Sequence, residues 1–212
     1  METRKDLAQE RVLFGPGNFF KLAQSNYGNN QRQGTFGEQF SEVYNLAING
    51  KLGSLYGKII LGNTATVLSK SQELIFIDFP DIKEGKISID ENLEDRLNGN
   101  PIKDVRFSKD KQIRAIPLDC VVGGSQNHES IAQNQLLIAM TGYEISPEMM
   151  AKLLERINAS CYILAPNSIS NSRVGIPFFG YNPEQNEWTI MAASIPKIKG
   201  DNRYSFAIPI NS

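Results

Sequence analysis

Three carboxylates and an ammonium group lie close together in one short segment of the chain, at Asp78, Asp81, Glu84 and Lys86. Metal-dependent nucleases use such a set, because carboxylates bind Mg²⁺ and the metal activates a water molecule. These carboxylates normally lie on adjacent strands, and the two residues between Asp81 and Glu84 leave barely enough chain for a turn. We therefore expect a strand end, a Pro-Asp turn and exposed charges here, and keep a Mg²⁺-dependent nuclease as the alternative function.

A second segment of the chain collects positive charge. Residues 103–114 carry five cations against two aspartates, whereas residues 78–95 carry seven carboxylates against two lysines. An aromatic ring lies among the cations, an arrangement that often holds single-stranded nucleic acid. A solvated hairpin tip would have the same composition, and the two charged segments could also pair with each other. The candidate contact residues of this basic hairpin are Lys103, Arg106, Phe107, Lys109, Lys111 and Arg114.

A polar loop is the third candidate site. Residues 26–33 consist of Asn, Gln and Gly with one tyrosine and Arg32, a composition suited to contact with a protein or an RNA. The segment has no apolar periodicity, which predicts a mobile loop. We take Arg32 as its contact residue.

Aromatic residues gather in a predicted hairpin near the C-terminus. Residues 176–181 contain two phenylalanines and a tyrosine, and Trp188 follows on the next predicted strand. Rings at such spacing usually bury large apolar areas. We therefore expect them in the core or at the edge of a sheet, with a binding platform as the other interpretation.

Motifs for several enzyme classes are missing from the sequence. The glycines at 53 and 57 stand four residues apart, where a phosphate loop needs five. One histidine and two cysteines cannot make a zinc site of standard composition. These absences favour a protein that is not an enzyme, and we expect no cofactor and no metal.

Composition limits the partner and the compartment. The formal net charge of -1 over 212 residues argues against a wholly basic nucleic-acid binder. Cys120 and Cys161 lack a paired or metal-like spacing, which fits a reducing compartment. Residues 1–9 are charged and do not resemble a signal peptide, and no run approaches the ~18 apolar residues of a membrane helix. We expect a cytoplasmic protein without a membrane anchor.

The periodicity of apolar residues predicts an α+β fold. Thr35 and Glu38 form a capping box before an amphipathic stretch, and Ser146-Pro147 begins another. Helices are predicted over 36–49, 129–141 and 146–157, and strands over three segments of 55–79 and over 103–107, 112–122, 161–165, 174–181, 188–194 and 204–210. Strands followed by helices and then strands indicate antiparallel sheet meanders with two to four amphipathic helices packed on one face. We expect a single domain over 1–212, with any subdomain boundary near 123–125.

By elimination, we expect a non-enzymatic subunit that acts by contact within a larger assembly. A protein is the expected partner, and nucleic acid is a further partner class that the basic hairpin and the polar loop would contact. A homo-oligomeric, capsid-like structural protein is a second alternative, beside the nuclease. The sequence leaves the oligomeric state open.

Overall fold

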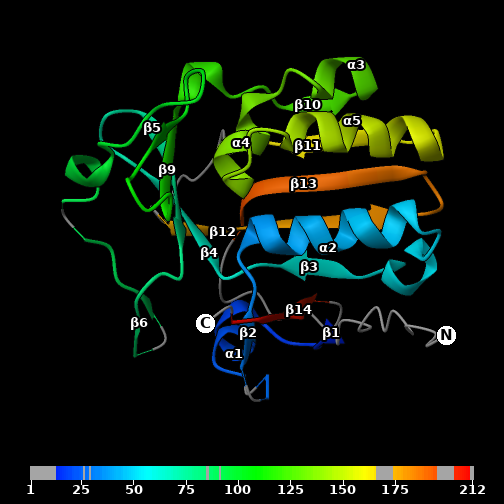
Figure 1. Ribbon diagram of the computed structural model, residues 1–212, viewed down its shortest axis with the longest axis horizontal. Helices are drawn as coiled ribbons and strands as arrows, with labels where there is room; N and C mark the ends of the chain where they lie inside the picture. The colour runs from blue at the N-terminus through cyan, green and yellow to red at the C-terminus, as the bar shows by residue number, and fades with distance from the viewer. Residues whose placement is uncertain are drawn as a thin grey trace, which may run out of the picture.

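The computed structural model describes residues 13–25, 27–28, 30–84, 86–90, 92–165, 174–194 and 203–210. Within these ranges the chain has a mixed α/β fold in which a large sheet dominates (Figure 1). The helices are α1 (Phe19–Ala23), α2 (Phe36–Ile48), α3 (His128–Ile131), α4 (Gln135–Thr141) and α5 (Ser146–Ile157). Short 3-10 turns cover Leu52–Leu55, Glu94–Arg96 and Leu118–Cys120.

Twelve of the described strands share the large sheet, and two form a separate hairpin. The strands of the large sheet are β1 (Leu13–Phe14), β2 (Gln31–Gln33), β3 (Ile59–Leu61), β4 (Thr64–Leu68), β5 (Glu73–Asp78), β8 (Arg106–Phe107), β9 (Ile113–Pro117), β10 (Gly124–Gln126), β11 (Ser160–Leu164), β12 (Val174–Asn182), β13 (Glu187–Ser194) and β14 (Arg203–Pro209). The separate hairpin consists of β6 (Ile82–Lys83) and β7 (Lys86–Ile87).

Local signals place the two longest helices. The Thr35 side chain accepts a hydrogen bond from the Glu38 backbone N–H, and the Glu38 carboxylate accepts one from the Thr35 N–H, so the predicted capping box is confirmed. The chain leaves α2 through Gly50, whose φ of 72° suits a residue without a Cβ. Helix α5 begins at Ser146 as expected, although this serine is the first helical residue and not the cap.

The helix predicted over 129–141 is two helices. Asn134 interrupts it, because its side chain accepts a hydrogen bond from the Leu136 N–H and thereby caps a new helix, while its amide donates to the Val122 carbonyl. Helix α3 therefore ends before this residue and α4 begins after it. The predicted end at residue 141 is confirmed, and Gly142 caps the helix with a φ of 79°.

The sheet is mixed and only partly a meander. The expected antiparallel pairs of β4 with β5 and of β8 with β9 are present, and an antiparallel pair of β5 with β9 joins them. Strand β3 does not pair with β4, because β12 lies between them: Phe178–Gly180 pairs with β3, and Val174–Gly175 pairs with β4. Two pairs, β11 with β13 and β14 with β3, are parallel. Pairing between segments so distant in sequence depends on tertiary packing, which local patterns do not encode.

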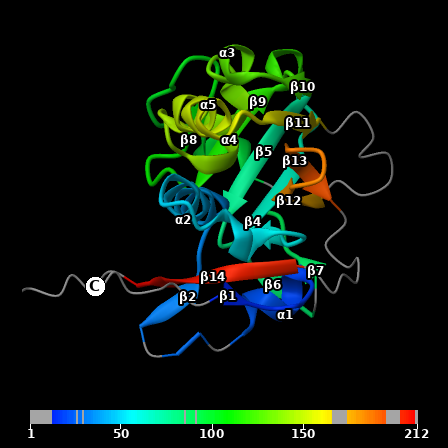
Figure 2. The same ribbon diagram turned by 90° about the vertical axis from the view of Figure 1, so that its right-hand side faces the viewer.

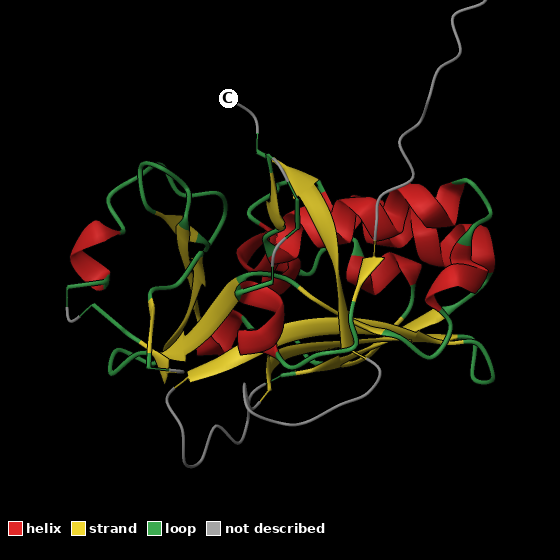
Figure 3. Cartoon of the chain, turned by 90° about the horizontal axis from the view of Figure 1, so that it is seen from below, coloured by secondary structure: helices red, strands yellow, loops and turns green. Residues whose placement is uncertain are grey.

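Helices α2, α4 and α5 lie on one side of the strands (Figures 2 and 3). The core beneath them is centred on Phe179, whose ring meets that of Phe36 at 5.2 Å and that of Trp188 at 6.5 Å. Helix α1 departs from the predicted single helical face, because Phe19 and Leu22 pack on the outward-facing residues of β3 and β12. The aromatic hairpin thus supplies core residues, as expected.

None of the described helices is long and apolar enough to span a membrane. Residues 124–126 form β10 and pair with β11 in the large sheet. The single domain and its boundary near 123–125 stay predictions.

Candidate functional site

The arginine at the end of the basic hairpin is part of the core. Arg114 is 1% exposed, and its guanidinium donates to both carboxylate oxygens of Asp78, one of them at 2.8 Å. The same group donates to the carbonyls of Ala139, Met140 and Lys111 at 2.8, 3.3 and 3.0 Å. Arg114 therefore cannot contact a partner at the surface, and the expectation that it does is corrected.

The buried ion pair belongs to a longer network. The Thr64 hydroxyl donates to Asp78 at 2.7 Å and accepts a hydrogen bond from the Phe36 N–H at 2.9 Å. Through Arg114, this chain of contacts joins β9 and the end of α4 to β5, β4 and the start of α2. The network fixes how the helices sit on the sheet at this end of the molecule.

The other residues of the basic hairpin divide into buried and exposed sets. Phe107 is 1% exposed and packs in the core, so it is not a surface ring for nucleic acid, and that expectation is also corrected. Arg106 donates to both carboxylate oxygens of Glu73, one of them at 3.1 Å. The exposed cations are Lys103, Lys109 and Lys111.

The four residues of the alternative nuclease site do not converge on one point. Asp78 faces inward to its arginine, whereas Asp81, Glu84 and Lys86 are exposed on the β6–β7 hairpin, and Lys83 pairs with Asp81 at 2.8 Å. Among the residues that the structure describes, no three of His, Cys, Asp and Glu are arranged to hold a metal ion. The structure therefore does not bring these four residues together as a site for one or two metal ions.

The polar loop ends in a strand that positions Arg32. Residues 31–33 form β2 and pair with β14, so this part of the predicted mobile loop is ordered, while Asn26 and Asn29 lie outside the described residues. The Arg32 guanidinium donates to both carboxylate oxygens of Glu38 at 2.8 and 2.9 Å. Its Cζ also lies 4.3 Å from the centre of the Phe79 ring, which is cation–π geometry.

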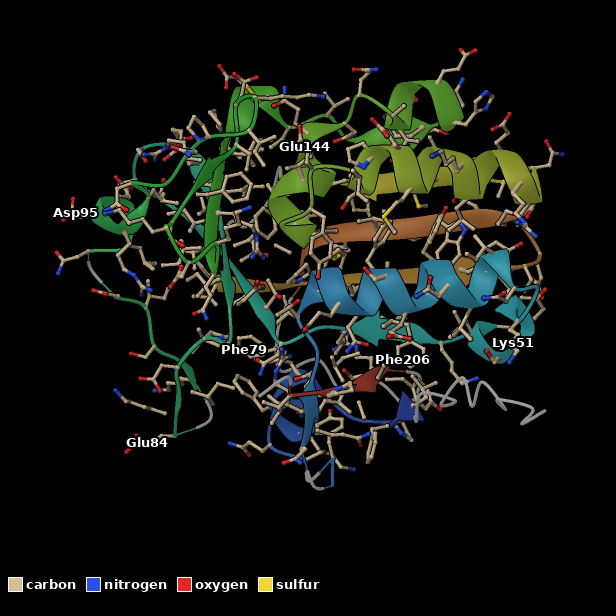
Figure 4. The ribbon with its side chains drawn as sticks, viewed as in Figure 1. Lys51, Phe79, Glu84, Asp95, Glu144 and Phe206 are labelled. Carbon is tan, nitrogen blue, oxygen red and sulfur yellow. The ribbon has the colours of Figure 1, made fainter. Side chains whose placement is uncertain are left out.

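Phe79 has an unusual backbone conformation. Its φ is +51°, in the left-handed region that bulky residues rarely occupy, and the following Pro80 normally restricts such a residue to extended backbone. The Phe79 N–H donates to the Asn63 carbonyl at 2.8 Å, which holds this conformation. Figure 4 labels Phe79 on the side of β4 that faces β2 and β14. Strain of this kind costs about 1–3 kcal/mol and concentrates at functional sites.

Tyr143 lies within the electrostatic reach of both ion pairs. Burial raises the pKa of its hydroxyl, and the negative charges of Glu38 and Asp78 raise it further. The helices that flank it approach closely, since a Cβ on Gly37 would lie 2.0 Å from the Thr141 carbonyl oxygen and 3.0 Å from the Tyr143 ring. Glycine at this position therefore allows the start of α2 to reach the end of α4.

Arg32, Phe79 and Tyr143 together form what we call the Arg32 surface. Their side chains are accessible, at 32% for Arg32, 37% for Phe79 and 39% for Tyr143. The sequence singled out Arg32 but neither aromatic residue. A Phe-Pro pair at a strand end was the available signal for Phe79, while the place of Tyr143 depends on contacts between helices.

Glu38 makes the stability of this surface depend on pH. Burial opposes ionisation, but hydrogen bonds from Arg32 and the Thr35 backbone, with the charge of Arg32, bring the Glu38 pKa below its ordinary value. A lowered pKa stabilises the fold above the unfolded-state pKa, and this stabilisation disappears as the pH falls through the folded-state pKa. Glu38→Gln should therefore be less stable than the wild type near neutral pH, with the difference shrinking in acid.

Urea unfolding between about pH 7 and about pH 3 measures this difference. Glu155→Gln, which changes an exposed carboxylate on α5, is the control and should follow the wild type throughout. A difference in the free energy of unfolding between Glu38→Gln and the wild type that stays constant over this pH range would contradict the expected linkage.

Comparison with known proteins identifies the fold. No protein-family model matches the chain, and no curated protein matches its sequence. A solved structure described as "Accommodation of massive sequence variation in Nanoarchaeota by the C-type lectin fold" matches with a TM-score of 0.55 and 13% sequence identity. The match covers 93% of this chain and 96% of that one. At this identity the likeness shows the fold alone: the chain has a C-type lectin-like fold.

Proposed function

We propose that this chain is a non-enzymatic recognition protein that binds a protein partner through the Arg32 surface. The observation that carries the proposal is Phe79, a half-exposed ring in a left-handed backbone conformation with an arginine stacked on it. A fold that only needed a turn here would be more stable with glycine or asparagine. The strained backbone at Phe79 therefore supports a binding role for its ring.

The residue types support a protein interface. Arginine and tyrosine are enriched among the residues that dominate binding energies, and rigid aromatic rings lose little entropy when a partner covers them. The two ion pairs near Tyr143 hold the surface in place before binding. Preorganisation of this kind lowers the entropic cost of association.

The charges favour a protein over a nucleic acid. Nucleic-acid affinity comes largely from cations that neutralise phosphates. Three arginines that the sequence offered for this purpose are each paired with a carboxylate within the fold, Arg32 with Glu38, Arg106 with Glu73 and Arg114 with Asp78. We therefore treat binding to nucleic acid as the alternative that the experiment must exclude.

The likeness in fold is compatible with recognition. The solved structure is described as a C-type lectin fold that accommodates massive sequence variation. A scaffold that tolerates such variation suits binding, where side chains on a stable frame choose the partner. We extend this reasoning to the present chain as part of the proposal, together with action inside a larger assembly.

The test is Phe79→Asn, which removes the ring and suits the left-handed conformation. Tagged wild-type and variant proteins are isolated gently from cells that naturally contain the protein, and the bound partner is quantified. We expect the variant to recover at least about tenfold less partner, as for a binding hot spot, and to unfold in urea no earlier than the wild type.

Tyr56→Asn is the matched control, because this tyrosine is 49% exposed at a different place on the molecule and should bind normally. Equal recovery with Phe79→Asn would exclude the ring as the contact. Loss of recovery together with lower stability would assign the ring a structural role. A partner released by nuclease treatment would transfer the proposal to nucleic acid.

A further inference from the structure

A cleft opens on the face of the sheet that lies away from α2 and α5. The pairing register aligns Ile59 of β3, Gly180 of β12, Thr189 of β13 and Tyr162 of β11 in one row across the strands. Side chains alternate between the two faces of a sheet, so this row faces outward, opposite the core residues Ile60 and Phe179. In Figure 3 this is the lower side of the sheet.

Gly180 creates the space in this row. It has no side chain, and a Cβ at this position would lie 3.3 Å from the Lys58 carbonyl oxygen. The cleft measures about 600 Å³, and its lining includes Ile59, Phe178 and the turn at 182–184. A volume of this size suits a small molecule.

The cleft pairs an apolar wall with a negative end. Phe178 belongs to the outward set of β12, and with Ile59 it forms the apolar side. Lys58 also lines the cleft, and its ammonium donates to the Ser54 carbonyl at 2.6 Å and lies 5.6 Å from the centre of the Tyr204 ring. Because the Lys58 ammonium is engaged by these partners, the exposed carboxylate of Glu184 is the charge that the turn at 182–184 offers to a ligand.

The side-chain amide of Asn182, which also lines the cleft, already forms hydrogen bonds within the turn at 182–184. The Asn182 side chain accepts a hydrogen bond from the Glu184 N–H and donates one to Gln185, both at 3.0 Å. These bonds hold the turn and leave the Glu184 carboxylate and the Thr189 hydroxyl as the polar groups for a ligand. Both can accept hydrogen bonds, and one of them is negatively charged.

We propose that this cleft binds a small organic cation with a flat apolar body. The body would pack on Phe178 and Ile59 over Gly180, and the ammonium group would reach Glu184 beside Thr189. The ring of Phe178 adds a cation–π contribution if the charge lies over its face. This site is separate from the Arg32 surface and does not depend on the proposed function.

The experiment titrates the protein with phenethylammonium and, separately, with the neutral 2-phenylethanol, by isothermal calorimetry and ligand-observed NMR. We expect saturable binding of the amine and weaker binding of the alcohol. Glu184→Gln should weaken amine binding by about fivefold, the contribution of an exposed ion pair. Phe178→Ala should weaken the binding of both ligands. Glu148→Gln, an exposed carboxylate on α5, is the control and should bind as the wild type does.

Glu184 is exposed, so its substitution leaves the fold intact and the result interpretable. Absence of saturable amine binding at millimolar concentration would overturn the proposal. Equal affinity for amine and alcohol, or an unchanged affinity in Glu184→Gln, would overturn the assignment of a cation. Binding unaffected by Phe178→Ala would exclude this cleft as the site.

Discussion

Arg114→Met is expected to lower the free energy of unfolding by about 3–5 kcal/mol, because it leaves the Asp78 carboxylate without its partner in a nearly dry site. The Asp78 side chain is 10% exposed and the Arg114 side chain 1%. The substitution also removes the donors to three backbone carbonyls, including that of Ala139. Urea unfolding followed by circular dichroism measures the loss.

The double variant Asp78→Asn, Arg114→Met separates the charge from the packing. Removing both charges should recover part of the lost stability, since an uncharged amide then replaces the unpaired buried carboxylate. Lys83→Met breaks an exposed pair with Asp81, at 73% and 60% exposure, and should leave the unfolding midpoint unchanged. A wild-type midpoint for Arg114→Met would refute a structural role for the pair.

Phe179→Ala is expected to cost about 3–5 kcal/mol, the usual range for truncating a buried aromatic residue. The ring is 1% exposed and lies edge-on to Phe36 at 5.2 Å and to Phe40 at 6.3 Å between ring centres. The free space that it shares with α2, α5 and Trp188 is only about 10 Å³, so truncation would leave a new cavity. Thermal and urea unfolding both report this loss.

The adjacent residue supplies the control on the same strand. Phe178 points to the opposite face and is half-buried, so Phe178→Ala should cost less than half as much. Equal losses for the two variants would mean that β12 does not separate the main core from a less buried face. The same result would also weaken the case for the cleft beside Gly180.

The residues that stabilise the fold differ from those of the Arg32 surface that we propose for recognition. The buried ion pair and the Phe179 cluster hold the helices on the sheet, and the Arg32 surface lies beside them with its side chains accessible. Among the aromatic residues that the structure describes, Phe79 is the one that adopts a left-handed backbone conformation. This division explains why we expect variants of the core to unfold the protein and Phe79→Asn to remove a contact without doing so.

The sequence by itself determined the local elements. The capping box at Thr35, the glycine after α2 and the Ser146-Pro147 start are chemical signals within a few residues of the structure they produce. Alternating apolar residues likewise predicted the strands near the C-terminus, and β11–β14 lie within two residues of the expected bounds. Asn134 was misread because a capping asparagine resembles any polar residue on a helix.

The tertiary structure alone decided which strands pair and which charged residues are buried. The insertion of β12 between β3 and β4 joins segments more than a hundred residues apart, and no local pattern carries that information. Arg114 had the same appearance in the sequence as the exposed lysines beside it, yet Asp78 and the end of α4 enclose it. Burial of a charge depends on a partner that another element supplies. The left-handed backbone of Phe79 and the contact of its ring with Arg32 likewise arise only when β2, β5 and α2 meet in space.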